Sequence, residues 1–221
     1  MVASCQPDIV ALQELDVRRA RTGKVDQAQV VADALKMNVR FHPAFRVMDE
    51  LYGDAILTAL PMRAIKAGPL PERPRAPITE PRGALWVAVT CGGHELQVIN
   101  THLGLDGRER LRQIDTLVGE EWLGHPDCAD PAVFLGDLNA LPGSRVWRRL
   151  SPRMRDAQRS WNQRRTKATF PSWLPCMRID HAFVSGSIEV IGSHVLRTKL
   201  TRLASDHLPL VVDIRIPPPA R

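Results

Sequence analysis

The feature that most constrains the fold is an apolar run that ends at a glycine and then turns polar, Val133-Phe-Leu-Gly-Asp-Leu-Asn139. Its first three residues are typical of a buried strand, and the Pro142-Gly143 pair that follows indicates a turn. Side chains two residues apart on a strand point the same way, so Asp137 and Asn139 are predicted to project together from one strand end. A carboxylate beside an amide can accept a proton from water and hold a phosphate oxygen. A polar turn that only closes the strand is the alternative interpretation.

Two earlier strand-like runs also end in polar residues. The run Asp8-Ile-Val-Ala-Leu-Gln-Glu14 ends in a carboxylate that could bind a hard divalent cation through oxygen. In Leu96-Gln-Val-Ile-Asn-Thr-His102, the side chains of Asn100 and His102 share one face of the predicted strand. An imidazole there can donate a hydrogen bond to a phosphate oxygen and, if protonated, stabilise its charge. A histidine that only packs and hydrogen-bonds is the alternative.

Two further runs of this kind lie near the end of the chain. Asp180 stands early in the apolar run Arg178-Ile-Asp-His-Ala-Phe-Val184, where a buried carboxylate is costly unless it has a partner. Asp206 and His207 stand directly before the last predicted strand, residues 208–216. They concentrate two titratable groups at the point where that strand begins.

Strand-like and helix-like segments are interspersed along the rest of the chain, whose length fits one or two domains. Six prolines between residues 61 and 82 predict an extended, irregular connection. Gly92-Gly93 separates two strand-like runs and predicts a hairpin. Further strands are predicted at residues 53–60, 84–90, 95–101 and 188–195, and helices at residues 26–38 and 108–122.

Composition narrows the class of protein. The hydrophobic content of 44% and the charged content of 24% are those of an ordinary globular protein. No apolar run approaches the ~20 residues of a membrane-spanning helix, so we predict no transmembrane segment. The four cysteines lie far apart without C-x-x-C spacing, which favours neither a zinc site nor a disulfide framework. The first residues are too polar for a signal peptide, and we expect a cytoplasmic location and a monomer.

Positive charge is concentrated in one segment. Between Arg145 and Lys167 there are nine basic residues and one acid, so this segment carries a charge of +8. The net charge of the whole chain is +6, so the other residues together carry −2. Trp147 and Trp161 lie within it. A basic segment with aromatic residues suits a polyanion, either nucleic acid or an anionic lipid surface. A solvated, arginine-rich loop and helix is the alternative.

Five motifs stand in a recognisable order, namely Pro7-Asp-Ile-Val-Ala-Leu-Gln-Glu14, Asn100-Thr-His102, Gly136-Asp-Leu-Asn139, Arg178-Ile-Asp180 and Ser205-Asp-His207. Together they resemble the endonuclease/exonuclease/phosphatase superfamily, which includes deoxyribonuclease I, abasic-site endonucleases, neutral sphingomyelinases and inositol-polyphosphate 5-phosphatases. The resemblance implies an α+β fold of four layers, an α/β/β/α sandwich of two mainly antiparallel sheets with helices outside. We expect residues 1–221 to form a single domain of this kind, truncated at its N-terminus.

The resemblance also implies a cofactor and a set of site residues. The cofactor is Mg²⁺, with Mn²⁺ as the alternative, and its implied ligands are Glu14 and Asp206. The other implied residues act on the phosphate or on the attacking water, and they are His102, Asp137, Asn139, Asp180 and His207.

Each of these residues has an implied role. His102 contacts the phosphate, and Asp137, with Asn139 beside it, orients or deprotonates the attacking water. Asp180 orients His207, which also gives the buried carboxylate the partner it needs. These roles agree with the chemistry of the reaction, because phosphodiester hydrolysis needs neutralised phosphoryl oxygens and a water aligned opposite the leaving group.

The chain departs from the family pattern in two places. In the family, a strand that ends in an asparagine of the metal and phosphate site, followed by a helix, precedes the segment that matches residues 7–14. Met1 falls where that helix should end. We therefore expect that the start codon was assigned too late, with a truncated chain as the alternative, and the activity of this form is open. Asp54 stands where we expect an asparagine.

The resemblance fixes the bond that is hydrolysed and leaves the molecule open. Thr169-Phe-Pro-Ser172, Arg82-Gly-Ala-Leu85 and the short length resemble bacterial members grouped with sphingomyelinase-like and glycolipid-related proteins. We therefore predict a metal-dependent phosphodiesterase or monoesterase that acts on a small molecule, a lipid or a sugar phosphate. A DNA or RNA nuclease is the second hypothesis, on the strength of the basic segment. A non-catalytic binding module that lost its first strand is the third.

Overall fold

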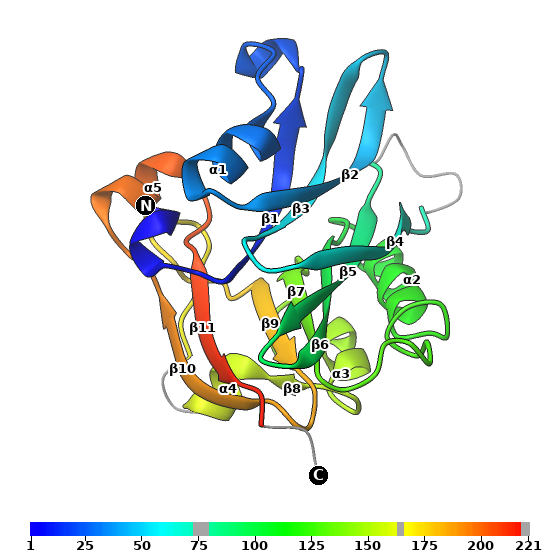
Figure 1. The fold of residues 1–221 in the computed structure, drawn as a ribbon. Helices are drawn as coiled ribbons and strands as arrows, with labels where there is room; N and C mark the ends of the chain where they lie inside the picture. The colour runs from blue at the N-terminus through cyan, green and yellow to red at the C-terminus, as the bar shows by residue number, and fades with distance from the viewer. Residues whose placement is uncertain (73–79, 163–165, 218–221) are drawn as a thin grey trace.

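The computed structural model describes residues 1–72, 80–162 and 166–217, which fold into three sheets flanked by helices (Figure 1). The largest sheet has six strands, and all its neighbouring strands are antiparallel except the central pair, which is parallel. In spatial order these strands are β4 (Met62–Pro69), β5 (Gly83–Cys91), β6 (His94–His102), β7 (Ala132–Asp137), β9 (Asp180–Val184) and β8 (Arg155–Asp156).

Two smaller antiparallel sheets accompany the large one. The α+β class is confirmed, but where two sheets were expected the described residues form three, because the edge strands β1 and β11 do not pair with each other. One small sheet contains, in spatial order, β1 (Ile9–Val17), β3 (Glu50–Thr58) and β2 (Asn38–Val47), and the other contains β10 (Glu189–Val195) and β11 (Leu210–Arg215).

The helices begin at residues that cap them. The side chains of Asp26 and Asp106 accept hydrogen bonds from backbone N–H groups of the first turn. The helix predicted after Asp26 is confirmed and ends at Leu35, and the one predicted at residues 108–122 ends at Leu117. Among the described residues, no helix is long and apolar enough to cross a membrane. The helices are α1 (Gln27–Leu35), α2 (Gly107–Leu117), α3 (Arg145–Leu150), α4 (Ala157–Trp161) and α5 (Lys199–Ala204), with 3-10 turns η1 (Val2–Cys5) and η2 (Ala20–Thr22).

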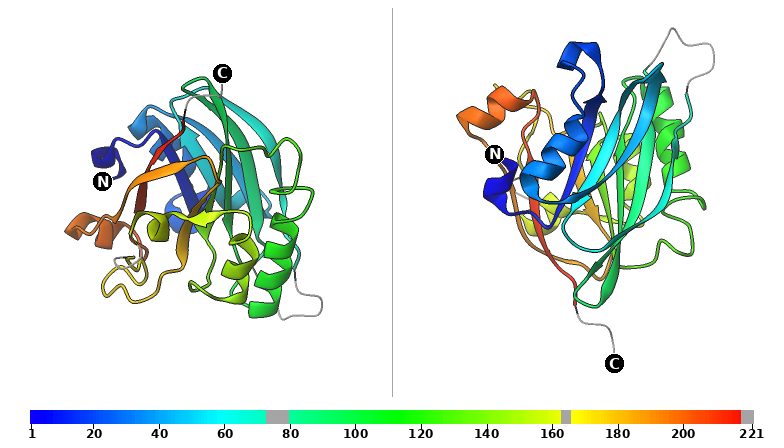
Figure 2. Two further views of the ribbon diagram at one scale, coloured as in Figure 1. Left: turned by 90° about the horizontal axis from the view of Figure 1, so that it is seen from below. Right: turned by 45° about the horizontal axis from the view of Figure 1, so that its top comes forward.

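Alternating side chains of the six-stranded sheet divide the core. Leu85 and Val87 of β5 pack into a cluster shared with β1 and β11, whereas Trp86 packs into a cluster shared with α2 and α3. The small sheets therefore cover one face of the large sheet, and α2 and α3 cover the other (Figure 2). Ala28 and Ala32 of α1 pack on the outer face of the three-stranded sheet. The strand ends of the large sheet are thus held between packed layers.

Two strands that contain proline were not predicted from the sequence. β4 occupies residues 62–69, so the prediction of an irregular connection is wrong there, and β2 contains Pro43 and was not predicted. Both are edge strands of their sheets, and an edge strand tolerates proline because one of its sides makes no ladder hydrogen bonds. The part of this connection at residues 73–79 lies outside the described residues.

Arginines of the basic segment make structural contacts. Arg149 forms an ion pair with Asp115 (3.0 Å), and the Arg155 guanidinium donates to backbone carbonyls of residues 185–188. The Arg159 guanidinium lies over the Trp147 ring, 5.3 Å from its centroid. These contacts favour the structural interpretation of the segment for the residues that they involve. Residues 163–165, which contain two of its arginines, lie outside the described part.

Candidate active site

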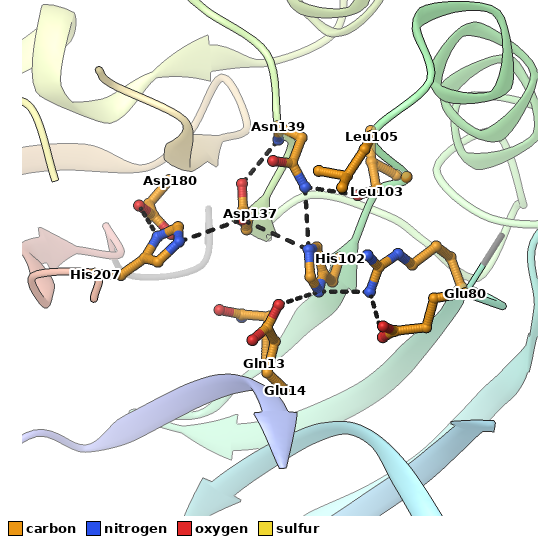
Figure 3. Close-up of polar contacts among 12 residues, drawn as sticks. Gln13, Glu14, Glu80, His102, Leu103, Leu105, Asp137, Asn139, Asp180 and His207 are labelled. Atoms are coloured by element: carbon orange, nitrogen blue, oxygen red, sulfur yellow. Dashed lines mark hydrogen bonds and ion pairs between the residues drawn. The ribbon is translucent and has the colours of Figure 1, made fainter. Parts of the chain in front are cut away.

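The register of the large sheet brings three predicted side chains to one edge. β6 pairs in parallel with β7 so that His102 is opposite Asp137, and β7 pairs with β9 so that Asp137 is opposite Asp180. Gly136 permits this pairing, because a Cβ there would lie 1.9 Å from the Thr101 carbonyl oxygen and its φ is +146°. The ends of β6 and β7 therefore lie beside the start of β9, and the three side chains come close together (Figure 3).

Asp137 lies between two imidazoles. Its Oδ2 is 3.6 Å from His102 Nε2 and 3.9 Å from His207 Nε2, and its Oδ1 accepts from the Asn139 backbone N–H at 2.8 Å. Burial, and then the Asp180 carboxylate, raise its pKa to about 7. A carboxyl group with this pKa can take a proton from water near neutral pH, which suits the role of base that remains a prediction for Asp137.

The predicted pairing of Asp180 with His207 is present. His207 Nδ1 is 2.8 Å from Asp180 Oδ2, and the His207 ring packs against Phe170 with 4.8 Å between ring centroids. Burial alone would lower the pKa of His207, but the hydrogen bond and the charge of Asp180, with Asp137 and Asp206, raise it to about 9. At neutral pH His207 is therefore a cation, suited to donate a proton.

We expect Asp180→Asn to lower the pKa of His207 from about 9 toward the ordinary histidine value, by at least one unit. The amide removes the largest charge that holds the ring protonated. An NMR titration of the histidine Cε1 protons in the metal-free protein measures this directly. Asp127→Asn, at an exposed carboxylate, is the matched control and leaves the His207 titration unchanged. An unchanged titration in Asp180→Asn would contradict the pairing.

His102 is buried and has its tautomer set by Arg82. Arg82 Nη1 lies 3.1 Å from His102 Nδ1, and because a guanidinium can only donate, Nδ1 accepts and the ring proton is on Nε2. Nε2–H faces the Asp137 carboxylate, whose Oδ2 is 3.6 Å away. The Asn139 amide nitrogen, 3.1 Å from Nε2, is itself a donor and makes its hydrogen bond to the Leu103 carbonyl instead (2.8 Å). Burial, then the charges of Arg82 and His207, lower the pKa of His102 to about 3. The side chain is thus a neutral hydrogen-bond donor, not a cation.

Arg82→Leu should release the tautomer of His102, because Nδ1 then loses its donor. The expected result is that the ¹⁵N shifts of the His102 ring change from those of a single Nε2–H form to those of a mixture of two tautomers. Arg82→Lys, which retains a positively charged donor, serves as the control and should preserve the single form. If Arg82→Leu also shows one Nε2–H form, another group sets the tautomer.

Glu14 reaches the site through a bulge in β1. The pairing of β1 with β3 shifts between Leu12 and Leu15, and Glu14 adopts a φ of 61° within this irregularity. Its Oε1 lies 3.7 Å from His102 Nδ1, and its side chain is 57% exposed. The strand was predicted to end at Glu14, but it continues to Val17. The bulge, not the strand end, turns the carboxylate toward the large sheet.

A buried amide connects the two sheets behind Glu14. Asn100 of β6 accepts from Gln13 Nε2 at 2.6 Å, and it donates to the backbone carbonyls of Leu12 (2.9 Å) and Ala55 (3.0 Å). The sequence placed Asn100 on the same face as His102 but gave no sign of these partners. They join β1 and β3 to the strand that carries His102.

Asp54, which stands where an asparagine was expected, is completely buried in β3. Burial raises its pKa to about 8, although the charge of Arg82 opposes this. The carboxyl is therefore mostly protonated at neutral pH and can donate a hydrogen bond, as an asparagine amide does. This departure preserves the hydrogen-bonding character of the position.

The site residues surround one cavity of about 1010 Å³. Glu14, His102 and Asp137 line it, and so do Asn139, Asp206 and His207, whereas Asp180 lies outside the lining and supports His207. The sequence analysis missed other lining residues, which include Glu80, Arg82, Arg108, Phe170 and Met177.

The ligand atoms of three residues lie close enough to hold a metal ion. One atom each from Asp137, Asp180 and His207 lies within 4.8 Å of the others, and carboxylate oxygens suit Mg²⁺ or Mn²⁺. Among the described residues, neither predicted ligand, Glu14 or Asp206, belongs to this group, although both line the same cavity. The donor set of the cavity therefore fits a hard divalent cation.

Comparison with known proteins shows the family of the chain and agrees with its fold. Residues 1–207 match the model of the Endonuclease/Exonuclease/phosphatase family. The chain belongs to this family, and its site is that of a phosphoesterase-like hydrolase. A search of curated proteins found no match.

Solved structures of this fold are similar over nearly the whole chain. An endonuclease/exonuclease/phosphatase from Beutenbergia cavernae is 21% identical with a TM-score of 0.78, over 97% of this chain and 64% of that one. The human Nocturnin catalytic domain with bound sulfate is 20% identical with a TM-score of 0.72, over 97% and 83%. The mannosyl-6-phosphatase Bt3783 of Bacteroides thetaiotaomicron is 20% identical with a TM-score of 0.73, over 98% and 88%.

Proposed function

We propose that this protein is a metal-dependent phosphoesterase that hydrolyses a phosphodiester or phosphomonoester of a small molecule, a lipid or a sugar phosphate. The observation that carries the proposal is the position of Asp137 between a neutral imidazole, His102, and a cationic one, His207. This arrangement places a base, a neutral hydrogen-bond donor and an acid around one cavity. The four-layer arrangement of the family is compatible with the packing of its sheets and helices.

Each residue around the cavity has a separate role in the proposed reaction. Asp137 accepts a proton from the attacking water, and the backbone N–H of Asn139 donates a hydrogen bond that orients this carboxylate. His102 Nε2–H donates to a phosphoryl oxygen, and its neutrality leaves the Asp137 carboxylate free to act as base. His207, kept protonated by Asp180, neutralises the phosphoryl group or protonates the leaving oxygen.

Glu14 and Asp206 would hold the cation in this proposal, because His207 Nδ1 is engaged by Asp180. A divalent cation in the cavity would supply Lewis-acid stabilisation of the phosphoryl charge. Calorimetric titration with Mn²⁺ tests the assignment. Glu14→Gln and Asp206→Asn should weaken binding, whereas Asp180→Asn should leave it within a few-fold. The opposite order would place the cation in the group of Asp137, Asp180 and His207.

Two observations bear on the substrate. The structural similarity to a mannosyl-6-phosphatase supports a sugar phosphate as one candidate for this chain. The nuclease hypothesis rests on the basic segment, and contacts of Arg149, Arg155 and Arg159 within the molecule reduce the charge that is free to bind a polyanion. A small or lipid phosphoester is therefore the preferred substrate, and nucleic acid the second candidate.

The test is release of p-nitrophenol from bis-p-nitrophenyl phosphate and from p-nitrophenyl phosphate, each with Mg²⁺ and with a chelator. Metal-dependent turnover of either compound supports the proposal, and the preferred compound distinguishes diesterase from monoesterase. A parallel assay on single- and double-stranded DNA and on RNA tests the nuclease hypothesis. If the protein binds the cation but hydrolyses none of these compounds, the binding-module hypothesis is favoured instead.

A further inference from the structure

Two segments beside the cavity expose large apolar side chains. The loop at residues 169–177 is hydrogen-bonded to the residues that directly follow the segment at residues 197–205, which includes α5. The Ser172 N–H donates to the Asp206 carbonyl (2.6 Å), and the Leu208 N–H donates to the Thr169 carbonyl (2.9 Å). Both figures of the whole chain place α5 (orange) and this loop (yellow) on the same side of the molecule. The exposed large apolar side chains of these segments, here named the apolar rim, are Trp173 (68% exposed), Leu174 (57%), Met177 (37%), Leu200 (56%) and Leu203 (84%).

The apolar rim is a concentration, not a random scatter. The described residues include thirteen exposed large hydrophobic side chains, and five of them fall in these two short segments. In α5 the usual pattern of burial is reversed, because Thr201 is its one buried residue while Leu200 and Leu203 face solvent. A capping box formed by Thr198 and Thr201 fixes the helix in place without burying either leucine. Solvent-exposed apolar groups on a fixed scaffold indicate a surface that contacts another apolar phase.

The charges within the two segments that carry the apolar rim have one sign, and the nearest acid along the chain is the exposed Asp206, directly after the second segment. Arg197, Lys199 and Arg202 are exposed, and the segments 169–177 and 197–205 contain no acidic residue. Within the part of the chain that the structure describes, none of these three basic side chains forms an ion pair with a carboxylate. Exposed leucines and a tryptophan beside unpaired basic groups are typical of helices and loops that lie in the interface of an anionic bilayer.

The apolar rim is continuous with the cavity. Met177 belongs to the rim and also lines the cavity, and Phe170, on the same loop, lines it and packs on His207. An amphiphile could therefore keep its chains in the bilayer beneath Trp173 and Leu203 while its head group reaches the site past Met177 and Phe170. A nucleic acid has no counterpart for the exposed leucines.

We propose that this surface docks on an anionic lipid bilayer and that the phosphoester hydrolysed in the cavity belongs to an amphiphile of that bilayer. The docking stands by itself, and the identity of the substrate rests on the proposed function. The surface is formed by residues other than those of the basic segment between Arg145 and Lys167, which the sequence had suggested for such a role.

The docking is tested by sedimentation with vesicles of phosphatidylcholine and of an equimolar mixture with phosphatidylglycerol, without added metal so that turnover plays no part. We expect binding to the anionic vesicles, at least tenfold weaker in Leu200→Ser/Leu203→Ser and in Lys199→Glu/Arg202→Glu. Each basic residue near such a surface contributes about fivefold to binding. Met48→Ser, at a 90% exposed position in the β2–β3 hairpin, is the matched control and should bind as the original chain does.

The same variants separate docking from chemistry. Leu200→Ser/Leu203→Ser should hydrolyse bis-p-nitrophenyl phosphate at the original rate, yet lose at least tenfold on a phosphodiester lipid presented in anionic vesicles. Equal vesicle binding by the original chain and both double variants would overturn the docking. If these variants instead lose binding to an oligonucleotide while vesicle binding stays unchanged, the surface recognises nucleic acid and the proposal fails. Vesicle binding without hydrolysis of any phosphoester would refute the proposed function and leave the docking intact.

Discussion

Asp137→Asn is expected to reduce turnover by about 10²- to 10⁴-fold, the range found when a general base is removed. The amide keeps the size and the hydrogen bond from the Asn139 backbone but cannot accept a proton from water. The measurement is the rate of p-nitrophenol release at saturating substrate and metal. Asp127→Asn, at an exposed carboxylate, is the matched control and should retain the original rate.

The same substitution should stabilise the fold, which separates loss of chemistry from loss of structure. The pKa of Asp137 is raised to about 7 in the folded protein, so its ionised form is disfavoured by burial and by Asp180. A raised carboxyl pKa means that the original protein loses stability as the pH rises from the unfolded value, about 4, through the folded value. Thermal melts at pH 8 should therefore show a higher midpoint for Asp137→Asn. A lower midpoint together with lost activity would mean that the residue supports structure and not the reaction.

Asp156→Ala should lower the free energy of unfolding by about 3–5 kcal/mol, the cost of leaving a buried charge without its partner. The Asp156 carboxylate accepts from the Arg178 guanidinium, from Trp147 Nε1 at 3.0 Å and from the Arg159 backbone N–H. Both Asp156 and Arg178 are buried. Urea unfolding measures the change, and Asp115→Ala, which breaks the exposed pair with Arg149, should cost no more than about 1 kcal/mol.

The pH dependence of the free energy of unfolding separates the contribution of the Asp156 charge from that of its side-chain packing. Burial would raise the pKa of this carboxyl, but His181, Arg178 and Trp147 hold it well below its usual range. A lowered pKa contributes stability above the unfolded value, about pH 4, and that stability is lost as the pH falls toward the folded value. Asp156→Asn should flatten this part of the curve. If its slope below pH 4 matches that of the original protein, the carboxylate is not the group responsible.

The strand ends of the site could be predicted from the sequence because they depend on local pattern. Short apolar runs that stop at His102 and Asp137 specify both the strand and the face of each polar side chain. The strand end predicted at Glu14 was wrong, because β1 continues to Val17 through a bulge that the local pattern does not show. The pairing of Asp180 with His207 followed from the family resemblance, and geometry agrees with it. These residues meet because strand register converts positions in sequence into neighbours in space.

What could not be predicted depends on tertiary contacts that have no local signature. Arg82 sets the tautomer of a histidine twenty residues away, and Asn100 finds its partners on another sheet. β2 and β4 were missed because proline argues against a strand unless the strand is known to lie at an edge. The role of Arg155 in the basic segment was hidden for the same reason, since its acceptors are backbone carbonyls of a distant turn.

The amide of Asn100 has a consequence for how such a site can diverge. The apolar contacts between the two layers of strands have no preferred direction, so by themselves they allow one layer to slide on the other. Hydrogen bonds from Asn100 to Leu12 and Ala55 are directional and fix where the carboxylate of Glu14 stands opposite the imidazole of His102. The spacing between the Glu14 carboxylate of one layer and the His102 imidazole of the other is therefore encoded at a single position. A change there could adapt the site to a phosphoester of different size without altering any residue that touches it.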